Sequence, residues 1–187
     1  MNKRTLNYAR GLISDSIYKS ASLRGLGMSD PRVMSLEKEV LYILNMEKAW
    51  NFLLENMDHE INSNLLKKYN EIITGCISGE RYNSDALAKL SDSLIKLEII
   101  RDPEVRALKT YCYIVRSGVF TKCNEEVALL VANKILLEAD KGVLQVPIDL
   151  LDMYREISTG YFKSGDDSEL FYFLQKTCIW RVNNELQ

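Results

Sequence analysis

The segment from Ser117 to Asn124 is where this chain could carry chemistry, because it joins two helical stretches and ends in a polar run. The backbone N–H groups that open the second stretch would form an anion-binding site. Glu125 and Glu126, however, place two carboxylates in that first turn. These carboxylates stabilise the helix dipole themselves and would repel an incoming phosphate. The residue types therefore predict a helix N-terminus poorly suited to holding a phosphate group.

Other reactive side chains are few. Cys123 stands at a helix start, which favours a lowered pKa, but the two neighbouring carboxylates oppose that effect. His59, the single histidine, lies in the polar sequence DHEIN between two helical stretches, and we expect an exposed loop residue there. The chain has no GxSxG, Walker A or GxGxxG sequence, and its four cysteines lack zinc-ligand spacing. We therefore predict no metal site and no nucleophile of a standard type.

The sequence SGVFTKCNEEVALL, which begins at Ser117, resembles the signature HPFxxGNGRxxR of the Fic (Fido) family. Most members of that family transfer AMP from ATP to a protein hydroxyl. In this register Phe120 and Asn124 keep the family residue. The other signature positions are replaced: His by Gly118, Pro by Val119, the two Gly by Cys123 and Glu125, the first Arg by Glu126 and the second by Leu129. The resemblance thus implies a degenerate member without the catalytic histidine and the anion-hole residues.

The flanking sequence extends the resemblance over most of the chain. The stretch Arg101–Phe120 is similar to the family's lead-in to the motif, and Ser78–Tyr82 resembles its GxxR element. Further upstream, KSASLRGLGMS resembles the SxxxE(G/N) inhibitory segment, with Ser20 and Gly25 matching and Arg24 in place of the glutamate. The family's β-hairpin flap has no counterpart here, because the stretch before Arg101 has room for one helix and little else.

What the resemblance implies about function follows from the altered positions. Without a side chain at Gly118 there is no general base for a target hydroxyl. A degenerate ligand loop is expected to comprise Gly118, Phe120, Thr121, Lys122, Asn124 and Glu126. Asn124 should serve as the N-cap of the following helix, Phe120 should anchor the loop in the core, and Cys123 and Glu125 should restrict the loop backbone. A new ion pair between Arg24 and Glu125 or Glu126 is a further hypothesis.

Three functions remain open at this point. The first is a catalytically silent Fic-fold protein that acts through protein contacts or regulation and needs no cofactor. The second is a divergent transferase of AMP, UMP or phosphocholine, or a small-ligand-binding protein, with ATP and Mg²⁺ relevant only if family activity survives. It would gain support if polar side chains converged on the loop, with Arg81, Arg106, Arg116, Ser117, Thr121 and Lys122 as candidates. The third is an unrelated helical interaction domain.

The apolar periodicity is helical nearly throughout and predicts an all-α, single-domain bundle of about eight helices. We expect residues 1–34 to hold a first helix and the inhibitory-like segment, and residues 35–187 to form the Fic-like core. The expected helices cover 2–19, 36–56, 62–77, 84–99, 103–117, 125–139 and two closing segments separated by residues 164–166. The helix over 125–139 is apolar on more than one face, which predicts the buried centre of the fold.

The composition limits the kinds of partner and the cellular location that we expect for this protein. With 187 residues of which 47% are hydrophobic, the chain can bury a substantial core. A formal net charge of −2 gives no general attraction to nucleic acid or anionic membranes. Dispersed cysteines and the lack of a secretory signal or membrane span predict a cytoplasmic protein, although an effector exported by a non-Sec route would look the same. The expected partner is an unidentified protein, and self-association is left open.

Overall fold

The computed structural model describes residues 7, 10–11, 36–75 and 82–181. Seven α-helices lie in this part of the chain: α2 (Leu36–Glu55), α3 (Ser63–Thr74), α4 (Ser84–Leu97), α5 (Pro103–Ser117), α6 (Asn124–Glu138), α7 (Leu151–Ser164) and α8 (Ser168–Phe173). A short 3-10 turn (Ile148–Leu150) precedes α7, and a π turn (Leu174–Cys178) follows α8. The all-α prediction is therefore confirmed. Among the described helices none is both long and apolar enough to cross a membrane.

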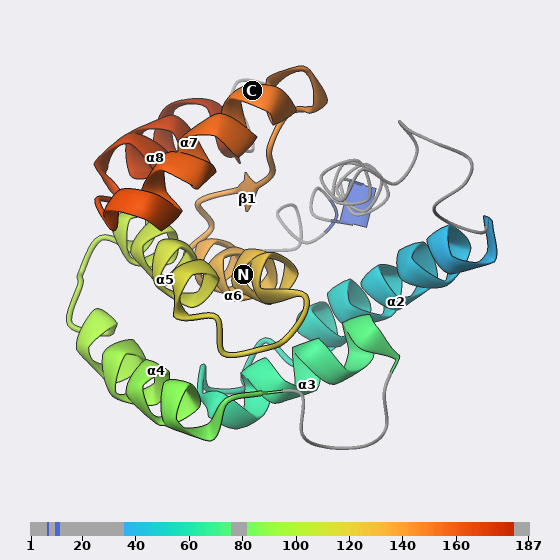
Figure 1. Cartoon of the computed structure of the whole chain (residues 1–187). Helices are drawn as coiled ribbons and strands as arrows, with labels where there is room; N and C mark the ends of the chain where they lie inside the picture. The colour runs from blue at the N-terminus through green and yellow to red at the C-terminus, as the bar shows by residue number, and fades with distance from the viewer. Residues whose placement is uncertain (1–6, 8–9, 12–35, 76–81, 182–187) are drawn as a thin grey trace, which may run out of the picture.

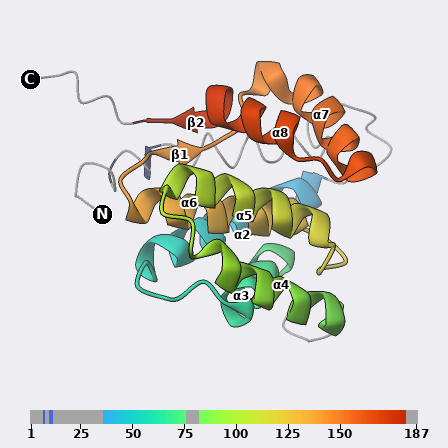
Figure 2. The same ribbon diagram turned by 90° about the vertical axis from the view of Figure 1, so that its left-hand side faces the viewer.

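The helices are stacked in three layers around α6. Helix α5 packs along α6 in the middle layer, α3 and α4 lie on one side, and α7 and α8 cover the other (Figure 2). Nearly every residue of α6 is buried, from Glu126 to Leu137. The prediction that this helix forms the centre of the fold is confirmed, since a helix that is apolar around its circumference can only be buried.

Local sequence signals set most helix boundaries. Asn62, Asn83 and Asp102 each precede a helix and accept hydrogen bonds from its first N–H groups. Pro103 occupies the first turn of α5, where its missing N–H costs nothing. Helix α3 ends at Thr74 and is followed by Gly75 in the left-handed conformation, with φ of 65°, so the expected end at 77 is wrong by three residues. Glycine adopts this backbone conformation without strain because it has no Cβ atom, and the helix therefore ends there.

Two strands were not expected. Val143–Leu144 (β1) pairs antiparallel with Ile179–Trp180 (β2), close to the C-terminal end of the described chain. Each strand has only two residues, which is too short to show an alternating pattern. This is the one sheet in the described residues, and the segment between Tyr82 and Pro103 holds α4 without a hairpin. The predicted loss of the flap therefore agrees with the structure.

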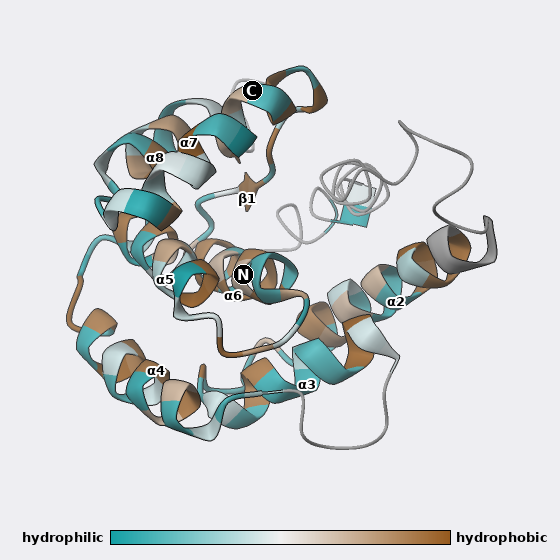
Figure 3. Cartoon of the chain, in the orientation of Figure 1, coloured by the Kyte–Doolittle hydropathy of each residue, from teal (hydrophilic) through white to brown (hydrophobic). Residues whose placement is uncertain are grey.

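The apolar faces of α2 and α4, which the helical periodicity predicts to be buried, are only partly so. Ala49, Trp50 and Leu53 in the second half of α2 lie in the core, whereas Leu41 in the first half is 54% exposed. That first half extends beyond α3 and the bundle (Figures 1 and 3). Ile95 of α4 is 65% exposed although its sequence position had suggested burial. Helical periodicity identifies an apolar face but does not show how far the partner helices extend.

Candidate functional site

The loop between α5 and α6 begins at Gly118, the position that the resemblance aligns with the family's catalytic histidine. Gly118 ends α5 in the left-handed conformation, with φ of 56°, and is exposed. A Cβ atom placed there would meet nothing within 4 Å. The position thus faces open space and supplies no group that could accept a proton.

Asn124 closes this loop through two hydrogen bonds to a single residue. Its Oδ1 accepts from the backbone N–H of Phe120 at 3.0 Å, and its Nδ2 donates to the Phe120 carbonyl at 2.6 Å. Asn124 is therefore not the N-cap of α6, contrary to expectation: it is the first helical residue, and its side chain bonds to the loop before it. Its amide satisfies both backbone groups of Phe120, as a paired strand would.

Cys123 keeps a backbone conformation that is typical of glycine. Its φ of 66° lies in the left-handed region, so the side chain does not exclude the loop backbone from that conformation. The loop is also held from α3, where Asn70 Nδ2 donates to the Lys122 carbonyl at 2.8 Å. Contacts on both sides of Cys123 impose a conformation that would otherwise be unfavourable for a residue with a Cβ atom.

The loop has one face in the core and one in solvent. Phe120 is buried and anchors the loop, as predicted, while Thr121 and Lys122 are exposed. The backbone N–H of Asn83 donates to the Val119 carbonyl at 2.8 Å, beside an isolated bridge between Tyr82 and Phe120. This pairing of a distant segment with the loop was not expected, since a single bridge leaves no repeating signal in the sequence.

The two carboxylates of the first turn of α6 both face core groups. Glu126 is 8% exposed, and its Oε1 accepts a hydrogen bond from Tyr42 Oη of α2 at 3.1 Å. The charge of Glu125 acts on the buried hydroxyls of Tyr111 and Tyr154, which are 2.6 Å apart. Burial chiefly, and the charge of Glu125 in addition, raise the pKa of Tyr154. The helix N-terminus therefore has negative charge fixed in its first turn.

The remaining polar candidates do not meet at the loop. Arg116 and Ser117 line a cavity of about 700 Å³ between α4, α5 and α7, together with Lys89 of α4. Arg116 donates to the Gly165 carbonyl at 3.2 Å. Arg106 lines a different cavity, beside the C-terminal half of α6. Neither of these two cavities includes a residue from 118 to 124.

Several expectations fall on residues whose structure is not described. The inhibitory-segment residues Ser20, Arg24 and Gly25 lie there, as does Arg81, so the hypothetical ion pair of Arg24 stays a prediction. His59 is exposed in the loop between α2 and α3, as expected, with its ring edge-on to Phe52. Within the described ranges no group of three His, Cys, Asp or Glu side chains could hold a metal ion.

Comparison with known proteins gives a structural likeness without a sequence match. No protein-family model matches the chain, and no curated protein matches it by sequence. Two structures of Fic-1 from C. elegans, residues 134–508 and the same fragment with E274G, superpose with TM-scores of 0.72 and 0.70. Both are 18% identical to this chain and cover 94% of it, whereas it spans 62–63% of theirs. An 18% identity establishes architecture alone, and the chain accordingly has the Fic fold.

Proposed function

We propose that this chain is a catalytically silent Fic-fold protein that acts by contacting a partner protein. The observation that carries the proposal is the environment of Glu126, which stands where the resemblance puts a phosphate-binding arginine. Its carboxylate is buried and accepts a hydrogen bond from Tyr42. A buried, hydrogen-bonded carboxylate at a helix N-terminus opposes the approach of a triphosphate, because like charges repel strongly where water is excluded.

The exposed glycine at 118 supports the same proposal. Transfer of a nucleotidyl group to a hydroxyl is assisted by a base within hydrogen-bond reach of that hydroxyl. Gly118 has no side chain, and the neighbouring Val119 and Phe120 are apolar and buried. Loss of the base and reversal of the phosphate-binding charge are independent changes, so together they weigh more heavily than either does alone.

A second candidate is a divergent transferase or a small-ligand-binding protein. The cavity beside α4, α5 and α7 favours it, because Lys89 and Arg116 share one space of about 700 Å³ with the carboxylates of Asp85 and Asp167. Tyr161 contributes an aromatic wall over which the Arg116 guanidinium lies, at 5.7 Å from the ring centroid. A cavity with polar groups of both signs and an aromatic wall could receive a small polar molecule.

Calorimetric titration with ATP, UTP, GTP and CDP-choline, each with Mg²⁺, distinguishes the silent protein from the transferase or ligand-binding protein. The silent protein should give no saturable heat at millimolar nucleotide. Saturable binding would favour the second candidate, and two variants would then locate the site. Glu126→Gln, which keeps the acceptor for Tyr42, should tighten binding if the ligand occupies the α6 N-terminus. Arg116→Gln should weaken it if the ligand occupies the cavity, and Glu156→Gln on the exposed face of α7 is the control.

A further inference from the structure

The first half of α2 carries an outward apolar patch that no other described helix covers. Four side chains with exposed fractions between 37% and 54% form this α2 patch: Val40, Leu41, Ile43 and Leu44. Along the second half of the helix the outward residues are polar: Glu47, Lys48, Asn51 and Glu55. Single exposed apolar side chains are common on protein surfaces, but four within two turns of one helix indicate a contact surface.

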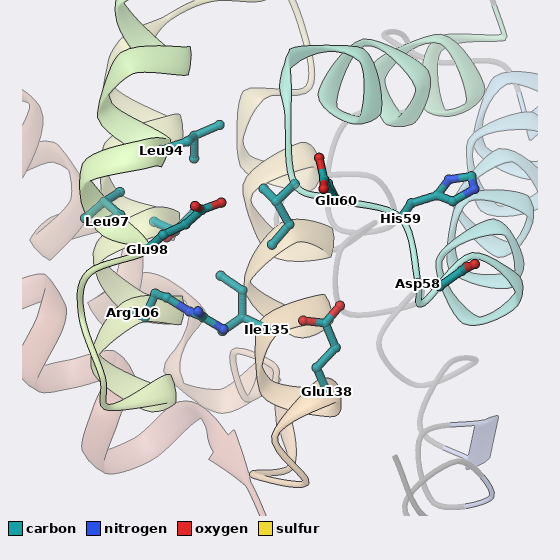
Figure 4. A pocket seen from close by; sticks show the side chains of 11 residues that line it. Asp58, His59, Glu60, Leu94, Leu97, Glu98, Arg106, Ile135 and Glu138 are labelled. Carbon is teal, nitrogen blue, oxygen red and sulfur yellow. The ribbon is translucent and has the colours of Figure 1, made fainter.

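The α2 patch lies apart from the cavities and on a helix that is held in place. The cavity that Arg106 lines is bordered by Asp58 and His59, beyond the C-terminal end of α2 (Figure 4). On the inner side of the first half, the Tyr42 hydroxyl donates to Glu126 of α6. This half extends past α3 and away from the bundle (Figure 1), so a second helix can lie along it without meeting the rest of the protein.

The spacing of residues along this side of α2 is self-complementary in an antiparallel pair. Leu41, Leu44 and Lys48 follow at intervals of three and four residues, and Glu37 stands four positions before Leu41 in the helix sequence. With a two-fold axis between Leu41 and Leu44, each Leu41 meets Leu44 of a second copy. Each Lys48 then comes opposite the position of Glu37. A parallel pair would instead put identical charges beside each other, which is unfavourable.

We propose that the α2 patch binds the α2 patch of a second copy of this chain, in an antiparallel two-fold contact. Such a contact requires a surface that is complementary to itself, and an apolar centre between opposite charges meets that requirement. Two turns of helix bury less than the roughly 800 Å² per partner of a standard interface, so the dimer should dissociate at micromolar concentrations. The inference goes beyond the proposed function, since it names a partner that any activity of the chain would leave unchanged.

Sedimentation velocity of the full chain over a series of concentrations measures this association. The wild type should show a monomer–dimer equilibrium. Leu44→Glu, which puts two carboxylates into the apolar centre of the dimer, should weaken it at least about tenfold. Ile95→Glu makes the same kind of change at a side chain that is 65% exposed on α4, and it should dimerise as the wild type does.

Charge reversal tests the antiparallel pairing. Lys48→Glu should weaken the dimer at least about fivefold, because it sets like charges opposite each other at both ends of the contact. Adding Glu37→Lys should restore the wild-type affinity to within about twofold, since both ion pairs form again with reversed polarity. The matched control is Lys48→Glu with Glu156→Lys, on the exposed face of α7, which has the same net charge and should remain weak.

Three results would overturn the proposal. A monomer up to millimolar concentration would mean that the α2 patch has another occupant, either the first 34 residues of the chain or a different protein. Equal weakening by Leu44→Glu and Ile95→Glu would indicate unspecific apolar association. Equal affinities of the two charge-balanced double variants would mean that net charge, and not the pairing of Glu37 with Lys48, controls the association. None of these results involves a nucleotide, so the dimer and the silent function can fail separately.

Discussion

At the scale of single residues, Asn124 is a structural clamp whatever else the loop does. Replacing it with alanine leaves the N–H and carbonyl of Phe120 without their partner at a partly buried position. We expect Asn124→Ala to lower the free energy of unfolding by about 1–3 kcal/mol, the usual cost of unsatisfied backbone groups. Urea unfolding followed by circular dichroism measures this loss of stability. Asn64→Ala on the exposed face of α3 is the control, and a loss no larger than that of the control would contradict the clamp.

Cys123 offers a second prediction, which concerns its left-handed backbone. In the interior of a helix, glycine is less stable than alanine by about 1 kcal/mol. At φ of 66° the order should reverse, because alanine keeps the steric conflict of its Cβ atom and glycine removes it. We expect Cys123→Gly to be at least as stable as Cys123→Ala in urea unfolding. At Asp92, exposed in the middle of α4, the alanine variant should be the more stable. The same order at both positions would count against the strained conformation.

At the scale of elements, the sequence was informative where a pattern is long. The apolar circumference of α6 predicted its central burial, and the starts expected at 62, 84 and 103 lie within one residue of those of α3, α4 and α5. Contacts between distant segments could not be predicted. The β1–β2 pair and the bridge from Tyr82 to Phe120 involve too few residues to leave a periodic signal. The loop shows the same limit: Asn124 was identified as important, but its hydrogen bonds to Phe120 depend on a backbone path that no residue type specifies.

The joint between α2 and α6 depends on one buried cation. Lys134 has no exposed surface, and its Nζ donates to the Asn56 and Met57 carbonyls just after α2 while pairing with Glu138. Lysine in this position caps the carbonyl end of α2, a favourable place for positive charge. We expect Lys134→Met to lower the free energy of unfolding by at least about 2 kcal/mol, since it leaves buried acceptors unsatisfied. Lys141→Met, which alters an exposed lysine just beyond α6, should change it by less than about 0.5 kcal/mol. An equal loss of stability in the two variants would show that Lys134 does not cap α2.

At the scale of the whole molecule, the two ends of α6 have opposite relations to charge. At its N-terminus the buried carboxylate of Glu126 has a core partner, the hydroxyl of Tyr42. At its C-terminal half, Glu60 and Glu98 border an open cavity and have no partner in the described structure. Exposed charges without a partner contribute little to stability, whereas the buried Glu126 would be costly to leave without its hydrogen bond.

The core as a whole should lose stability in alkali. Burial raises the pKa of Cys112 to about 12 and of Cys178 to about 11, and it raises the pKa of Tyr69 as well. The unfolded chain releases these protons near the ordinary values of 9.0 for cysteine and 10.0 for tyrosine, while the folded chain retains them. Above pH 9 the folded state thus binds more protons than the unfolded state, and stability falls with rising pH, by about 1.4 kcal/mol per unit for each such group.

Urea unfolding between pH 8 and 11, under reducing conditions, should show this loss, and a single hydroxyl can be isolated within it. Tyr69 is completely buried and its Oη has no hydrogen-bond partner, so Tyr69→Phe removes a titrating group without breaking a bond. That variant should match or exceed the wild type in stability at pH 8 and should lose less stability above pH 10. Tyr172→Phe, at a hydroxyl that is largely exposed on α8, should follow the wild-type curve. If stability were independent of pH up to 11, or if both variants flattened the curve equally, buried ionisable groups would not be limiting this core in alkali.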